Sequence, residues 1–310
     1  MIKKFRFIFL LLILSSSLFA QIESFITTGN EKLLKKNYEG ALADFKKALT
    51  ENPGNIQALN GSALAQNGLG NPQEALLIAE SAIQLNNQKD AAFYVKGEIL
   101  SSMKDFAGAI LAYNAALEIN PASFQSTIGK SKAYNQLGNV KEAYKILDEA
   151  IEKYPSNSEL LIARGLLNNN KEKYSKALDD FDKAISLDDT KNAFSAHFNR
   201  GITYSYLQEY EPALSDFNKA AELDPTNANA FHSRALANYQ LGNFEASVKD
   251  FEQSNELNPN NSVTLYNLGM AYYKLEDIEN ACMYFHKSCS MNNTNSCKMI
   301  IMVCSDKQKK

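Results

Sequence analysis

Tryptophan is absent from this 310-residue sequence, histidine occurs three times, and all four cysteines lie near the C-terminus. No Gly-x-Ser-x-Gly, His-Glu-x-x-His or phosphate-binding glycine motif occurs, so the common arrangements for hydrolysis, zinc chemistry and nucleotide binding are missing. The 32 basic and 35 acidic residues leave a net charge of −3. That balance argues against a general binder of nucleic acid or anionic membranes, which would have a basic patch. We therefore expect a protein that is not an enzyme, with no cofactor and no bound metal.

Long apolar segments are also missing, except for one near the N-terminus. Three basic residues within positions 3–6 precede an apolar run over positions 7–14, and a short segment that ends in Ala20 follows. This layout predicts a secretory signal peptide at residues 1–20, because the apolar run is shorter than the roughly 20 residues of a membrane-spanning helix. An uncleaved N-terminal anchor is the alternative. Cleavage after Ala20 would remove three basic residues and no acidic ones, which leaves a net charge of −6.

The signal peptide also predicts where the protein works. We expect export, first of all to the periplasm of a Gram-negative bacterium, with secretion or N-terminal anchoring as the alternatives. Beyond residue 20 no segment is apolar enough for stable membrane insertion. An exported protein meets an oxidising environment, in which its cysteines can form disulfide bonds.

What the chain has throughout is a pattern of small and large residues that recurs every 34 residues. Within each unit, small residues occupy positions 8, 20 and 27, and a mostly large apolar residue occupies position 24. A fixed period of this length is typical of stacked helices, in which no single unit can bury its own apolar face. The residues at position 8 are Gly29, Ala63, Gly97, Ser131, Gly165, Gly201, Ala235 and Gly269. The residues at position 24 are Phe45, Ala79, Tyr113, Leu147, Phe181, Phe217, Phe251 and Phe285.

Each unit is predicted to contain two helices joined by a short turn, which is often Leu-Gly-Asn because glycine accepts the left-handed backbone that ends a helix. Positions 20, 24 and 27 lie on one face of the second helix. Proline at position 32 ends that helix in most units. The predicted array spans 21–295, and residues 296–310 form a capping helix and a polar tail. The eight units are 22–55, 56–89, 90–123, 124–157, 158–191, 194–227, 228–261 and 262–295.

This pattern resembles the tetratricopeptide repeat family over nearly the whole mature chain. The segments 200–204 and 213–220 carry the resemblance most specifically. It implies an all-α, right-handed α-solenoid of about eight helix-turn-helix units, whose first helices line a concave groove. Because Ala79 and Leu147 replace the usual ring at position 24, we expect looser packing in the second and fourth units.

By that resemblance the groove is lined by neutral side chains that become more aromatic toward the C-terminus. Tyrosine suits such a surface, because it provides contact area at low entropic cost and keeps a polar tip. We expect a protein or peptide segment to bind across units six to eight, although any one of the rings could instead fill a helix interface. The family's clamp for the C-terminal carboxylate of heat-shock chaperones is not expected, because Lys132 is the only groove cation. The predicted groove residues are Phe198, Asn199, Tyr206, Asn229, His232, Tyr239, Tyr266 and Tyr273.

Arginine at position 7 and aspartate at position 23 recur together in three units, as Arg164 with Asp180, Arg200 with Asp216, and Arg234 with Asp250. An anion-binding ladder is one interpretation. An ion pair between the two helices of each unit is the better one, because a partly buried arginine needs a carboxylate.

The four cysteines are spaced seven, eight and seven residues apart. Seven residues make two helical turns, so an antiparallel hairpin of helices with a second helix at about 295–304 would place Cys289 opposite Cys297 and Cys282 opposite Cys304. In an exported protein this arrangement predicts two disulfide bonds that close the C-terminal cap. Buried free thiols, a zinc site with His286 and catalytic thiols are the alternatives; the spacing fits zinc poorly, and no Cys-x-x-Cys motif is present.

Together these features predict an exported, non-catalytic scaffold that binds a peptide or protein segment in its groove. A structural subunit of an envelope or secretion assembly is the first alternative. A carbohydrate-binding module, which would also use neutral aromatic and amide side chains, is the second.

Overall fold

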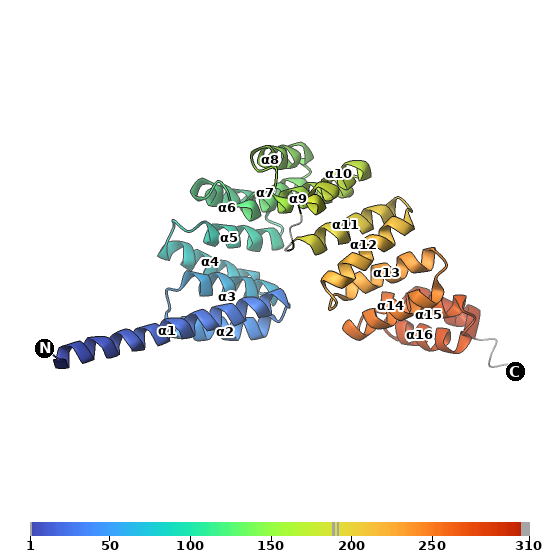
Figure 1. The fold of residues 1–310 in the computed structure, drawn as a ribbon, viewed down its shortest axis with the longest axis horizontal. Coiled ribbons are helices and arrows are strands. Elements are labelled where there is room, and N and C mark those ends of the chain that lie inside the picture. The colour runs from blue at the N-terminus through green and yellow to red at the C-terminus, as the bar shows by residue number, and fades with distance from the viewer. Residues whose placement is uncertain (1, 188–189, 191, 305–310) are drawn as a thin grey trace. The chain divides into compact units, whose positions relative to one another are not determined.

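The computed structural model describes residues 2–187, 190 and 192–304, with the backbone alone for residues 2–17. Every regular element in these ranges is a helix. The chain divides into two compact units, each of which contains several of the 34-residue repeats: residues 1–153 form the first unit and residues 154–310 form the second unit. In each unit successive helices pack side by side (Figure 1). The first unit contains α1 (Ile2–Leu34), α2 (Tyr38–Glu51), α3 (Ile56–Gly68), α4 (Pro72–Leu85), α5 (Asp90–Ser102), α6 (Phe106–Ile119), α7 (Phe124–Gln136) and α8 (Val140–Lys153). The second contains α9 (Ser158–Asn170), α10 (Tyr174–Ser186), α11 (Ala193–Tyr206), α12 (Tyr210–Leu223), α13 (Ala228–Gln240), α14 (Phe244–Leu257), α15 (Ser262–Lys274), α16 (Ile278–Ser290), α17 (Thr294–Met299) and a π-helical turn (Ile300–Cys304).

The chain is thus all-α, and its helices lie two to each 34-residue unit of the sequence. Helix α1 is continuous from residue 2 through the predicted cleavage point to Leu34. Its C-terminal part packs on α2, with Ile22 and Ile26 buried beside Phe45. The predicted signal peptide falls mostly on residues 1–17, whose side chains lie outside the described part. Where side chains are described, no helix combines the length and the apolar character that crossing a membrane requires.

The turn inside each unit has the same backbone conformation whether or not glycine is present. Gly70, Gly138 and Gly242 have φ angles of 82°, 79° and 81° at position 15 of their units. Left-handed backbone also occurs at this position in the other five units, although a Cβ disfavours it. The non-glycine residues there are Lys36, Lys104, Glu172, Gln208 and Glu276.

The last residue of most units caps the first helix of the next unit. The side chain of Asn55, for example, accepts a hydrogen bond from the backbone N–H of Ala58, and Asn157 does the same for Leu160. These caps satisfy amide groups that have no partner within the helix. Lys89 takes this place before α5 and makes no such bond.

The large rings at position 24 form the core of their units. Phe217 is 2% exposed, and a Cβ built on Gly201 would come within 2.8 Å of its ring. Two of the rings also contact the first helix of the following repeat. A Cβ on Gly61 would lie 2.3 Å from the ring of Phe45, and one on Gly129 would lie 2.6 Å from the ring of Tyr113. The rings therefore fit against bare backbone, which explains the small residues around them.

We expected looser packing around Ala79, but side chains of the next helix fill the space that a ring at position 24 would occupy. Val95 occupies, in its own unit, the position at which Gly61 and Gly129 stand in theirs. Ala79 is completely buried in one cluster with Val95 and Ile99. The apolar volume has moved from the second helix to the following first helix.

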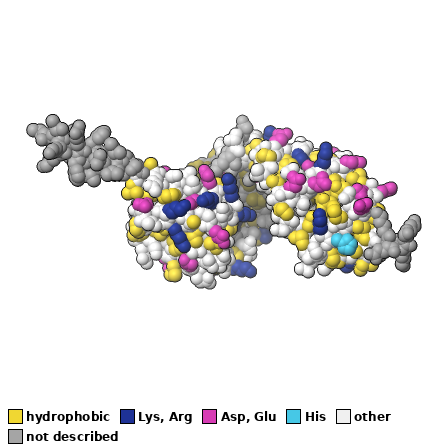
Figure 2. All heavy atoms as spheres, turned by 90° about the horizontal axis from the view of Figure 1, so that it is seen from below, with side chains coloured by type: hydrophobic (Ala, Val, Ile, Leu, Met, Phe, Trp, Pro, Cys, Tyr) yellow, Lys and Arg dark blue, Asp and Glu magenta, His cyan; other side chains and the backbone are white. Residues whose placement is uncertain are grey.

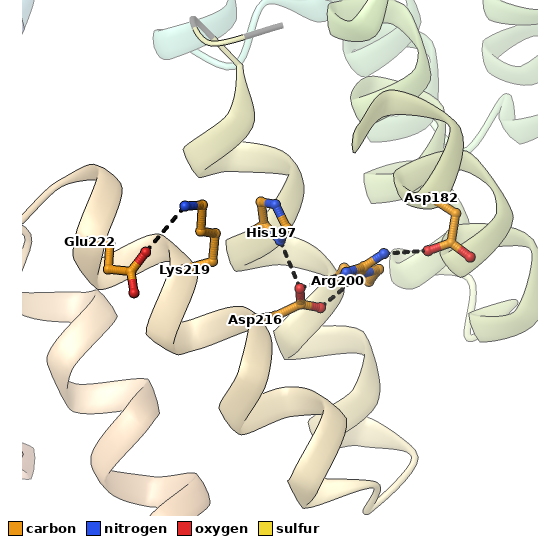
Figure 3. Close-up of polar contacts among 6 residues, drawn as sticks. All are labelled: Asp182, His197, Arg200, Asp216, Lys219 and Glu222. Carbon is orange, nitrogen blue, oxygen red and sulfur yellow. Dashed lines mark hydrogen bonds and ion pairs between the residues drawn. The ribbon is translucent and has the colours of Figure 1, made fainter. Parts of the chain in front are cut away.

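The predicted interhelical ion pairs are confirmed. Arg164, Arg200 and Arg234 each place Nη2 2.6–2.7 Å from a carboxylate oxygen of Asp180, Asp216 and Asp250, respectively. Figure 3 shows the central pair, in which Arg200 also contacts Asp182 of α10 at 2.7 Å. Asp216 has a second partner as well, because His197 Nδ1 lies 2.8 Å from its carboxylate. Each buried carboxylate thus joins the two helices of its unit.

The C-terminal cap has the predicted hairpin form. The helix expected at about 295–304 is α17, which continues into the π-helical turn. The structure brings the cysteines together in the two predicted pairs, Cys289 with Cys297 and Cys282 with Cys304, with sulfur atoms 1.98 Å and 2.03 Å apart. Beside them, buried Ser296 donates a 2.7 Å hydrogen bond to Ser288. The cap therefore packs on α16 and closes the end of the second unit.

Candidate functional site

The second unit contains a cavity of about 180 Å³ between the first helices α13 and α15. Phe251, the core ring of α14, contributes to its wall, and none of the described residues that line it is charged. The lining residues are Leu236, Tyr239, Gln240, Phe251, Tyr266, Asn267 and Met270.

Helical periodicity brings these residues together. On α13 the lining residues are spaced three and four apart, so Leu236, Tyr239 and Gln240 share one face. On α15 Tyr266 and Met270 are four apart, with Asn267 beside them. The lining residues of α13 and those of α15 therefore lie on the two helix faces that border the cavity.

The rings around the cavity are held by further aromatic contacts. The ring of Tyr239 packs edge-on against Phe244 at 5.4 Å, and Tyr266 lies tilted against Phe285 at 6.1 Å. Burial raises the pKa of the Tyr239 hydroxyl, and nearby Tyr266 adds to this shift. Tyr239 is therefore neutral at physiological pH and presents a hydroxyl that can donate or accept a hydrogen bond.

His232 contacts Asn267, one of the two amide side chains in the cavity wall. Its Nδ1 is 2.9 Å from Thr264 Oγ1, and its Nε2 is 3.5 Å from Asn267 Nδ2. Because an amide nitrogen can only donate, Nε2 must accept and the proton of the neutral ring lies on Nδ1. Burial lowers the pKa of His232, which favours this neutral form.

The structure brings three of the eight predicted groove residues to this place. Tyr239 and Tyr266 line the cavity, and His232 contacts Asn267 of its wall. Tyr273, on the same helix as Tyr266, is 39% exposed, and Asn229 is exposed near the start of α13.

The other predicted groove residues lie on α11, away from the cavity lining. Phe198 packs on Phe194 at 5.5 Å and on the core ring Phe217 at 5.9 Å, so it fills a helix interface. Asn199 donates a hydrogen bond to Ser195 on its own helix. Tyr206 is 60% exposed and stacks on Tyr174 at 5.5 Å.

Sequence reasoning missed four lining residues on the first helices. Leu236 and Met270 occupy position 9 of their repeats, and Gln240 occupies position 13. None of these three is aromatic, whereas the groove prediction rested mainly on aromatic residues. Asn267 is at position 6, and no sequence signal distinguishes it.

Charged residues of both signs make up 22% of the sequence. Figure 2 shows Lys and Arg side chains interspersed with Asp and Glu on the face that it draws. In the part of the chain that the structure describes, no three His, Cys, Asp or Glu side chains could together hold a metal ion.

Known proteins resemble this chain over part of their length. Superkiller complex protein 3 of Homo sapiens is 26% identical over 194 residues, which are 59% of this chain and 12% of that protein. Hsp70-Hsp90 organizing protein of Triticum aestivum is 26% identical over 165 residues, 52% of this chain and 27% of that protein. The chain thus spans less than a third of either relative. The crystal structure of yeast Tom70 has the same fold, with a TM-score of 0.71 at 19% identity over 93% of this chain and 57% of that chain.

Family models described as tetratricopeptide repeat match most of the sequence. The matched residues are 28–90, 63–124, 100–167, 194–227, 228–261 and 251–283. They cover more than half of the chain, and most helices of the structure lie within them, although α10 does not. The chain therefore belongs to the tetratricopeptide repeat family.

Proposed function

We propose that this protein is an exported, non-catalytic scaffold that binds a peptide or protein segment on the first-helix face of its second unit. The observation that carries the proposal is the uncharged cavity between α13 and α15, walled by Tyr239 and Tyr266. Such a pocket, mostly apolar with a few polar groups, is typical of a binding site. Proteins of this family mediate protein–protein interactions, and one relative is named as an organizing protein for Hsp70 and Hsp90.

Photo-crosslinking in living cells tests directly whether this face binds a partner. A photo-reactive amino acid at Tyr273, beside the cavity on α15, should capture a partner protein, which mass spectrometry then identifies. Met283 on the second helix α16 is the matched control, because both side chains are 39% exposed. Adding Tyr239→Ala should reduce capture from position 273. Equal capture from both positions, or capture that Tyr239→Ala leaves unchanged, would refute the proposed face.

Export to the periplasm is supported by the basic start and apolar run of residues 3–14 and by the paired cysteines. The mature protein should begin at Gln21 when its N-terminus is sequenced from an envelope fraction. Deletion of residues 2–20 should retain the protein in the cytoplasm. An intact N-terminus on exported protein would instead indicate the anchored form.

A second candidate, a structural subunit of an envelope or secretion assembly, is favoured by exposed leucines on second helices of the first unit. Leu77 of α4 is 66% exposed and Leu111 of α6 is 70% exposed. They stand one repeat apart, at the same position of neighbouring units. If this candidate is right, Leu77→Ser with Leu111→Ser should shift the native complex to lower mass in a gradient, whereas Tyr239→Ala should not.

A further inference from the structure

We propose that export converts Gln21 into an N-terminal pyroglutamate, so that the mature chain begins with a neutral lactam ring in place of a charged amino group. This inference rests on the export part of the proposed function and goes beyond it, because it assigns a site of covalent modification. The site lies on α1 in the first unit, whereas the candidate cavity belongs to the second unit.

The described part of α1 changes from exposed to packed at the predicted cleavage point. Residues 18–21 are exposed, and Phe19 exposes 69% of its surface. Ile22, the next residue, is 8% exposed and belongs to one cluster with Phe45 of α2. The part of α1 before this point extends beyond the other helices of the first unit (Figure 1). Cleavage after Ala20 therefore removes exposed chain and no residue of that cluster.

The side chain of glutamine can react with the amino group of the same residue once that group is free. The α-nitrogen of Gln21 attacks the carboxamide carbon Cδ and a C–N bond forms. The bond from Cδ to Nε2 breaks, and Nε2 takes a proton from the attacking nitrogen and leaves as ammonia. Both reacting atoms belong to one residue, so the step is intramolecular and needs no oxidant, reductant or co-reactant.

The leader sequence prevents this reaction until it is removed. Before cleavage the α-nitrogen of Gln21 is part of the peptide bond to Ala20, and an amide nitrogen does not act as a nucleophile. Cleavage converts it into a free amine beside an exposed side chain. The state of Gln21 therefore reports whether the leader has been removed.

The start of a helix is a favourable place for a lactam. After cleavage α1 begins at Gln21, and a helix N-terminus has partial positive charge, which disfavours an ammonium group there. The lactam removes that ammonium charge and leaves the carboxylate of Glu23, in the new first turn, to interact favourably with the helix dipole. The ring closes through the backbone nitrogen as in proline, which the first helical position tolerates.

Mass spectrometry of the protein purified from the envelope tests the proposal. The N-terminal tryptic peptide should span residues 21–32 and weigh one ammonia less than the linear peptide. Its α-nitrogen should not react with an amine-specific label. The synthetic linear peptide of residues 21–32, taken through the same steps, is the control for cyclisation during handling and should stay largely linear.

Two variants separate cyclisation from cleavage. Gln21→Ala should be cleaved at the same bond and should show a labelled α-amino group, because alanine has no carboxamide. An aminopeptidase should release alanine from this variant and should leave the unchanged protein intact, since such enzymes need a free amino group. Deletion of residues 2–20 keeps the α-nitrogen of Gln21 in a peptide bond and should give no lactam. A lactam in that cytoplasmic protein would show that export is not the step that frees Gln21.

This inference and the proposed export fail in different ways. A free, labelled amino group on Gln21 of the exported protein would overturn the lactam and leave cleavage and export standing. An intact N-terminus, or a mature terminus at another residue, would overturn both the lactam and the proposed cleavage point. The binding face of the second unit is tested separately by crosslinking from Tyr273.

Discussion

At the scale of single residues, the turn at position 15 of each repeat has a left-handed backbone that does not depend on contacts of the side chain there. Gly242 and Gln208 occupy equivalent turns with φ angles of 81° and 62°. Nothing lies within 4 Å of a Cβ built on Gly242, and Gln208 is exposed. A substitution at either position therefore acts through the backbone.

Gln208→Gly should raise the stability of the second unit by about 0.5–1 kcal/mol. The left-handed conformation costs a residue with a Cβ roughly 1–2 kcal/mol, and glycine removes this cost. Part of the gain is offset because glycine has greater conformational entropy in the unfolded chain. The urea midpoint measures the change. Gly242→Ala is the reciprocal control and should lower the midpoint; a decrease for Gln208→Gly would show that the turn is unstrained.

His232 gives the second unit a pH dependence of predictable sign. Because burial lowers its pKa in the folded protein, the unfolded chain binds the proton more readily. Stability is therefore complete above the unfolded pKa of about 6.5 and falls as the pH drops below it. NMR titration of the ring gives its pKa directly. The loss of stability between pH 7.5 and 5.5 should be smaller in His232→Gln than in the unchanged protein, and an equal loss in both would contradict this account.

At the scale of helices, the space between a second helix and the following first helix is filled by a large side chain from either one. Phe45 on α2 faces Gly61 on α3, whereas Ala79 on α4 shares a cluster with Val95 on α5. The large group can come from either helix, because what must be conserved is the space filled between them.

Ala79→Phe should therefore destabilise the first unit by about 1–3 kcal/mol through overpacking against Val95. Adding Val95→Gly recreates the arrangement of Phe45 with Gly61 and should recover part of that loss, although glycine in α5 costs about 1 kcal/mol by itself. A double-mutant cycle of unfolding free energies measures the coupling, which should exceed about 1 kcal/mol. Additive effects would mean that the two side chains do not compete for one space.

At the scale of the whole molecule, the cap stabilises one end of an array whose units contact only their neighbours. Cys282 and Cys304 close a loop with a sequence separation of 22, and Cys289 and Cys297 close one of 8. Replacing the first pair by serine should cost about 3 kcal/mol, and replacing the second about 2.5 kcal/mol, in the chain-entropy description.

Hydrogen exchange should show this loss in α16 and α17 and leave the first unit unchanged, because repeat arrays lose stability locally. Peptide mapping without reductant checks the pairing itself. A bond between Cys282 and Cys289 would contradict the hairpin, and faster exchange throughout the first unit would contradict the local effect.

Much of the architecture was predictable because it depends on local periodicity. The small residues at position 8, the rings at position 24 and the pairing of Arg200 with Asp216 follow from residues that recur at constant spacing. The cysteine hairpin was predictable for the same reason, since two seven-residue spacings leave one antiparallel alignment. The candidate site was less predictable, because register identifies the inward face and not the side chains that leave space on it.

The sequence by itself determined the helix pairs, their turns and the face that each helix presents, because those follow from residues within one 34-residue period. Only the tertiary structure decided that Phe198 fills an interface while Tyr239 borders a cavity, although both occupy inward positions. It also decided that Val95 replaces the ring missing at Ala79. The physical reason is common to both: whether a space is filled depends on the summed volumes of side chains from three helices, which no single repeat contains.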